Sequence, residues 1–227
     1  LRLYRPVRCH ILNSANRILV TKRLDIVSRI YGGQLVLDGT VEIPQGWGYV
    51  EDCLLTPNTR VNMTSVLRVE KIITLSQGSL LNIHAGQLQI LTGAKIETTG
   101  DNSGYITTRG KSSDGGVSKV FGAADGNSFF IPYAHKIGGQ RIDRSMTITR
   151  TGTRNKTARF WYVNGKYPKL RESYPFYVRI DTKEDLSDLK LTMKNHEPTV
   201  PSTYRLLYFR ENTGEEIGIP TPTELIF

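Results

Sequence analysis

Residues 78–100 read GSLLNIHAGQLQILTGAKIETTG, and this stretch decides the fold. Its glycines, at positions 78, 86, 93 and 100, are eight, seven and seven residues apart. Each interval holds an alternating strand of about five residues and a tight turn in which glycine supplies a positive φ. Strands this short cannot bury a face alone, so they must share a continuous core. The pattern predicts an all-β fold, either a short-strand β-solenoid, which the even spacing favours, or an antiparallel meander. The predicted core residues are Leu81, Ile83, Leu88, Ile90 and Ile96.

The second half of the chain has a different character. Turn clusters rich in Asp, Asn and Gly fill residues 101–128, and the strands that follow are longer and more aromatic. Pro, Gly and Asn separate them at intervals typical of a β-sandwich. The sequence therefore predicts a basic N-terminal arm or strand segment over 1–30, a solenoid-like repeat domain over 31–124 and a β-sandwich-like domain over 125–227.

Positive charge is concentrated at the start of the chain. The 227 residues carry a net charge of +9, and residues 1–30 hold seven basic groups against the single acid Asp25. Such an arm indicates an acidic partner, although arginine alternating with apolar residues is also the pattern of a half-buried strand with a solvated face. The candidate partner-binding residues are Arg2, Arg5, Arg8, Arg17, Lys22 and Arg23.

Catalytic and metal-binding patterns are missing from the sequence. The four histidines are scattered without metal-ligand spacing, and no nucleophile or phosphate-loop motif occurs. We therefore expect no enzyme activity, no cofactor and no metal site. We also expect no nucleic-acid binding, because the excess charge lies away from the aromatic strands. No apolar run approaches the roughly 18 residues of a membrane-spanning helix.

Aromatic side chains are the candidates for ligand recognition. Trp47 and Tyr49 flank Gly48 in a predicted turn, while Trp161 lies in a strand and Tyr167 in the loop that follows. Exposed rings of this kind stack on sugars or peptides, whereas buried ones serve the core or a domain interface. The sequence leaves both interpretations open for Trp47, Tyr49, Trp161 and Tyr167.

The two cysteines, Cys9 and Cys53, are too few for a disulfide framework and lack metal-site spacing. Two alternatives remain open. They form one bridge if the compartment is oxidising, or they are two buried free thiols.

Three segments in the second half carry a resemblance to a known group of proteins: Phe129-Phe130-Ile131-Pro132, Ile137-Gly138 and Arg144-Ser145-Met146-Thr147-Ile148-Thr149. Together with the Gly-punctuated strands that precede them, these segments resemble surface and secreted proteins of Bacteroidota that are often exported by the type IX secretion system. The spacing before Gly138 is longer than that pattern, and Ser145 stands where proline is usual.

The resemblance implies a non-catalytic structural or display module of a large bacterial cell-surface protein, such as an adhesin, with neighbouring domains as its partners. An extracellular, cell-surface location follows from the same resemblance. Two alternatives remain: a glycan- or protein-binding module, and an accessory domain of a secreted enzyme.

Overall fold

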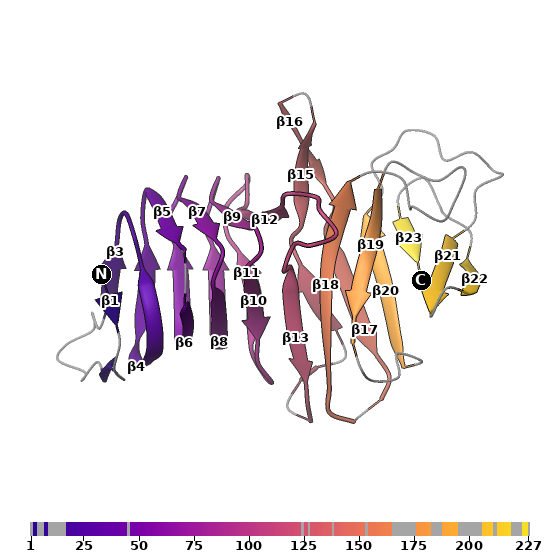
Figure 1. The fold of residues 1–227 in the computed structure, drawn as a ribbon, viewed down its shortest axis with the longest axis horizontal. Coiled ribbons are helices and arrows are strands. Elements are labelled where there is room, and N and C mark those ends of the chain that lie inside the picture. Colours follow the sequence, from indigo (N-terminus) through magenta and orange to yellow (C-terminus); the bar gives the residue numbers. More distant parts are fainter. Residues whose placement is uncertain are drawn as a thin grey trace. The chain divides into compact units, whose positions relative to one another are not determined.

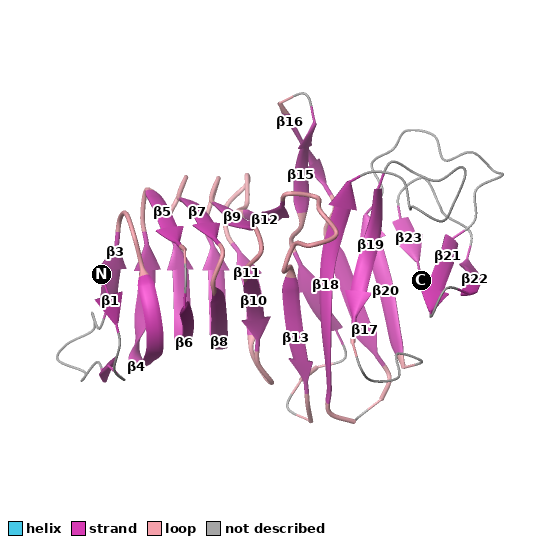
Figure 2. Ribbon diagram, in the orientation of Figure 1, coloured by secondary structure: helices cyan, strands magenta, loops and turns pink. Residues whose placement is uncertain are grey.

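The computed structural model describes residues 2–3, 7–8, 17–44, 46–123, 125–126, 128–137, 139–152, 154–164, 176–182, 188–194, 206–210, 213–218 and 224–226. Within these ranges the regular elements are all strands, as Figure 2 shows. The predicted all-β, solenoid-like fold is confirmed, with about four stacked coils among the described residues.

Two compact units make up the structure. The first comprises Leu1–Asp125 and Thr153–Glu184, and the second comprises Gly126–Gly152 and Asp185–Phe227. The sequence analysis divides the chain after residues 30 and 124 instead. Strand pairing accounts for both differences. The early strands join the first unit by pairing with its next strand, and residues 153–184 return to that unit by pairing with its last parallel strand.

Each coil of the solenoid contributes to three parallel ladders (Figure 1). One long strand serves the first and second ladders, and a register shift in its middle separates the two halves. A short strand forms the third ladder. The long strands are β4 (Asp25–Leu37), β6 (Gly46–Leu55) and β8 (Val66–Leu75), and the short ones are β5 (Thr40–Ile43), β7 (Arg60–Met63), β9 (Leu80–Ile83) and β12 (Tyr105–Thr108).

The stacked repeat is longer than the glycine interval. Thr40 pairs with Arg60 and Arg60 with Leu80, so one coil advances by 20 residues. In the last of these coils the long strand is split into β10 (Gln87–Ile90) and β11 (Lys95–Thr98), which both pair with β8. The glycine cadence of residues 78–100 therefore marks the sides of a single coil, not successive coils.

Inward-pointing apolar side chains stack from coil to coil and form the core. Ile30, Val50, Val69 and Ile90 occupy one column of the first ladder and are each 0% exposed. The predicted core residues Leu81, Ile83, Leu88, Ile90 and Ile96 are all buried. A fully buried side chain of this size contributes about 1.5–3 kcal/mol through the hydrophobic effect, so the columns are the main source of stability.

The turns between the second and third ladders also stack. Asn58 has a φ of 60° and Gly78, one coil later, has a φ of 68°. Asparagine and glycine are the residues that adopt this left-handed conformation most readily, so the same turn recurs with either residue. The backbone amide of Asn58 donates to the Gln77 carbonyl, and the backbone amide of Gly78 donates to the Asn102 carbonyl. These hydrogen bonds link successive turns.

The parallel ladder ends at β13 (Val117–Phe121), which pairs in parallel with β10. The next strand in the sheet, β18 (Lys156–Asn164), runs antiparallel to β13, and β19 (Phe176–Asp181) runs antiparallel to β18. At the other end, β1 (Arg2–Leu3), β2 (Val7–Arg8) and β3 (Arg17–Val20) pair in parallel with β4.

The second unit contains an antiparallel sheet and two hairpins. The strand order of the sheet is β14 (Ser128–Ile131), β17 (Met146–Arg150), β20 (Leu189–Lys194) and β23 (Glu224–Ile226). The hairpins pair β15 (Ala134–Ile137) with β16 (Gln140–Asp143) and β21 (Leu206–Arg210) with β22 (Thr213–Gly218). Phe129, Ile148 and Met193 are among its buried side chains.

Candidate functional site

The basic N-terminal segment is built into the first unit. Arg17, Lys22 and Arg23 are exposed, and the Arg23 Nε lies 3.1 Å from a carboxylate oxygen of Asp25. Arg2 and Arg8 fall in strands β1 and β2, whereas Arg5 lies outside the described residues. The described part of this segment thus forms strands that extend the parallel sheet.

One of the four candidate aromatic residues, Trp161, is buried, and another, Tyr167, lies outside the described residues. The Trp161 side chain is 2% exposed, with the guanidinium carbons of Arg159 and Arg179 at 4.7 and 5.3 Å from its ring centroid. Its neighbours Phe160 and Tyr162, on the other face of β18, are also buried. A ligand cannot stack on Trp161 while it is covered in this way.

Trp47 and Tyr49 lie together on the outer face of the first ladder. Residues 47–49 belong to strand β6, where the sequence suggested a turn. Strand alternation points both rings outward, and the intervening Gly48 points inward, where an added Cβ would be 2.4 Å from Ile26 Cδ1. The rings meet edge to face with centroids 5.8 Å apart. Trp47 is 46% exposed, which is high for so large an apolar side chain.

Two arginines from neighbouring coils flank these rings. Strand register places Arg29 of β4 and Arg68 of β8 on either side of Tyr49. The Arg29 guanidinium lies 5.3 Å from the Tyr49 centroid and 4.6 Å from that of Tyr31. The Arg68 guanidinium lies 4.8 Å from Tyr49 and 6.0 Å from Trp47. These distances are those of cation–π contacts, which hold the planar groups in fixed orientations.

Two glutamines of the next coil, Gln87 and Gln89, lie beside these rings and arginines on the same outer face. Arg68 Nε donates to Gln89 Oε1 at 2.5 Å, and Gln89 Nε2 donates to Gln87 Oε1 at 3.1 Å. Arg29 forms an ion pair with Glu70. We call this surface the aromatic–arginine face; its residues are Arg29, Tyr31, Trp47, Tyr49, Arg68, Gln87 and Gln89.

Sequence reasoning found Trp47 and Tyr49 but missed the residues around them. Arg29, Tyr49, Arg68 and Gln89 occupy one register position in successive coils, at offsets of 20, 19 and 21 residues. Aligning the sequence at a 20-residue period would have brought them together. Nothing in the local pattern of any single strand does so.

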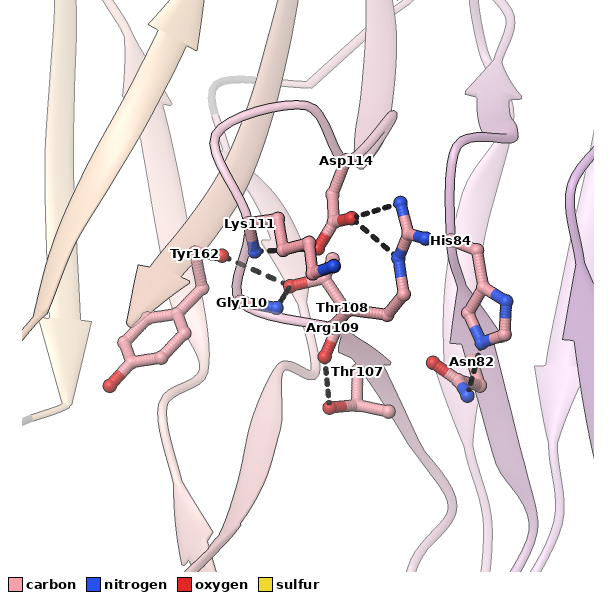
Figure 3. Close-up of polar contacts among 9 residues, drawn as sticks. All are labelled: Asn82, His84, Thr107, Thr108, Arg109, Gly110, Lys111, Asp114 and Tyr162. Atoms are coloured by element: carbon pink, nitrogen blue, oxygen red, sulfur yellow. Dashed lines mark hydrogen bonds and ion pairs between the residues drawn. The ribbon is translucent and has the colours of Figure 1, made fainter. Parts of the chain in front are cut away.

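A polar cluster lies at the end of the third ladder (Figure 3). The buried Asp114 carboxylate accepts hydrogen bonds from Arg109 Nε and from the Lys111 amide, both at 2.9 Å. The Thr108 hydroxyl donates to the Tyr162 carbonyl at 3.0 Å. Because both Asp114 oxygens are engaged, the role of this carboxylate is to fix the 109–116 loop.

His84 stands beside this loop, with its Nε2 2.7 Å from the Asn82 amide nitrogen. That nitrogen is a donor, so Nε2 accepts, as it does in a neutral imidazole. Burial and then the charge of Arg109 lower the pKa of His84, although Asp114 and Glu42 act in the opposite direction. Neutral His84 continues a side-chain ladder in which Asn82 also donates to Asn62, and Asn62 donates to Glu42.

We expect the stability of the first unit to fall as the pH is lowered through the ordinary histidine pKa of about 6.5. The lowered pKa of His84 means that the unfolded chain binds the proton more readily, so stability is full above this range and decreases towards the folded-state pKa. Urea unfolding at pH 7.5 and 5.5 measures the change. In His84→Gln the difference between the two pH values should shrink, and an unchanged difference would contradict this assignment.

Within the described ranges, the side chains form neither a cluster suited to a metal ion nor a reactive thiol. No group of three or more His, Cys, Asp or Glu side chains gathers there around a common point. Cys53 is a free thiol, and burial, with a smaller effect of Asp52, raises its pKa to about 12. It is therefore protonated and unreactive in the folded chain. Cys9 lies outside the described residues.

Two further findings concern membrane-spanning helices and similarity to known proteins. A search of the described residues for a helix long and apolar enough to cross a membrane found none. Comparison with family models, curated proteins and solved structures gave no match to this chain.

Proposed function

We propose that this chain is a non-catalytic display module of a large extracellular bacterial surface protein, and that it recognises glycans through the aromatic–arginine face. The observation that carries the proposal is the exposure of Trp47, which is 46% exposed beside the ring of Tyr49. Two neighbouring rings bordered by oriented polar groups form an apolar patch with a polar rim, which supports contact with a ligand.

The chemistry of the face suits a sugar. Aromatic rings stack on the apolar C–H surface of a pyranose, while its hydroxyl groups need nearby donors and acceptors. Arg68 and the amides of Gln87 and Gln89 supply those groups next to the rings. The parallel strands beneath hold all these side chains in one register, so little side-chain entropy would be lost on binding.

The test is a glycan array with the full chain, followed by titration of each binding sugar. Trp47→Ala should weaken binding at least tenfold, because a stacked ring contributes more than about 1.4 kcal/mol. Leu19→Ala is the matched control, since Leu19 is an exposed apolar residue of the same unit, 60% exposed, and lies outside the face. Both variants should keep the parent melting temperature. An array without binding, or equal affinity of Trp47→Ala and parent, would overturn the proposal.

A further inference from the structure

The charge of the aromatic–arginine face is unbalanced at one position. Arg29 forms an ion pair with Glu70, and the nearby Lys71 Nζ lies 2.8 Å from a carboxylate oxygen of Glu51. Arg68 differs from both. Within the described part of the chain its contacts are the two rings and Gln89, and no carboxylate pairs with it.

The orientation of Arg68 leaves donors available. Among the described residues, its Nε alone is engaged, in the hydrogen bond to Gln89 Oε1. The guanidinium is planar and carries further N–H groups on its two terminal nitrogens, which match the two oxygens of a carboxylate or a sulfate. Its contacts with Tyr49 and Trp47 fix the plane of the fork. A cation held in this way is a preorganised anion-binding group next to a sugar-stacking surface.

From this juxtaposition we infer that the glycan is anionic: a sugar ring stacks on Trp47 and its carboxylate or sulfate group binds the free edge of Arg68. The inference rests on the proposed glycan-binding function and adds the class of sugar. Gln89 supports the geometry, because its acceptor oxygen holds Arg68 Nε and its nitrogen is in turn held by Gln87.

Calorimetric titration of the full chain against matched sugars tests the inference. One arm compares oligogalacturonate with its fully methyl-esterified form, and the other compares a sulfated galactan oligosaccharide with its desulfated form. We expect the anionic member of at least one pair to bind about tenfold more tightly, because a charge-assisted hydrogen bond is stronger than a neutral one. The arm that shows the difference identifies the anion as carboxylate or sulfate.

Two variants separate this inference from the proposed function. Arg68→Gln should weaken the anionic sugar more than the neutral one and bring the ratio of their affinities close to one, whereas Trp47→Ala should weaken both and keep that ratio. Arg68→Lys should restore only part of the preference, because an ammonium keeps the charge but lacks the planar fork. Equal affinity of the parent chain for the anionic and neutral members of both pairs would overturn the anionic class and leave glycan binding standing. Absence of binding to every sugar would overturn both.

Discussion

Replacing Lys119 by methionine should lower the free energy of unfolding of the first unit by about 3–5 kcal/mol, because it breaks a buried ion pair. Lys119 is 1% exposed and occupies the core column of Ile90 on the last parallel strand. Its ammonium donates to the carbonyls of Leu91 and Ala94 at 2.8 and 3.0 Å and forms an ion pair with Asp125. Methionine fills the volume but leaves the Asp125 carboxylate without its cation and removes the hydrogen bonds from Lys119 to the two carbonyls.

Urea unfolding followed by circular dichroism measures the loss. The matched control is Lys95→Met, since Lys95 forms an exposed pair with Glu97 and should change stability by no more than about 1 kcal/mol. Asp125 retains the amides of Gly93 and Gly122 as donors. A double variant, Lys119→Met with Asp125→Asn, should therefore be less destabilised than the sum of the single changes. A cost for Lys119→Met no larger than that of the control would contradict this role.

Gly115→Ala should destabilise the first unit by about 3 kcal/mol or more, since overpacking a rigid site is costly. An added Cβ would lie 1.5 Å from the Gly86 carbonyl oxygen and 2.5 Å from the carbonyl carbon. The obstacle is backbone, so no side-chain rotation relieves it. The Gly115 amide donates to the His84 carbonyl at 2.8 Å, and this link between successive coils would have to lengthen.

Gly126→Ala, at the first residue of the second unit, is the control for the same substitution in open space, because an added Cβ there meets nothing within 4 Å. It should leave stability within about 0.5 kcal/mol of the parent. Thermal unfolding of both variants measures the difference in stability. Equal melting temperatures would show that the backbone around Gly115 accommodates the added methyl group.

The sequence predicted the fold class well but the length of the repeat poorly. The short glycine interval of residues 78–100 arises because the long strand of that coil is split. Gly93 lies in the break between β10 and β11. In each of β6 and β8 one ten-residue strand serves two ladders, with no glycine at the register shift between them. The 20-residue period is therefore hidden by a bulged strand and by turns that accept Asn58 in place of glycine.

The candidate site was predicted only in part, for a physical reason. Alternation shows which residues share a face of a strand, but the sequence predicted a turn at Trp47 and Tyr49, which lie in strand β6. It cannot show whether a face is covered, and at residues 160–163 of β18 both faces are buried, including Trp161. The alternation in residues 117–121 also aligns Lys119 with Val117 and Phe121, which indicates an inward lysine, but only the structure supplies the acceptors that make this tolerable.

The change of strand direction at β13 has a consequence for how such a chain can grow. Because β18 is antiparallel, no further coil can be added beyond β13 without displacing it. New coils can be inserted only before β13, where the strands of successive coils already pair at a 20-residue offset. Duplication of residues 46–65 would insert one coil, and with it a second Trp47–Tyr49 pair about 4.8 Å along the axis. The number of binding sites for a polymeric ligand would then increase with the number of coils. The antiparallel strand β18 that ends the parallel sheet would stay unchanged.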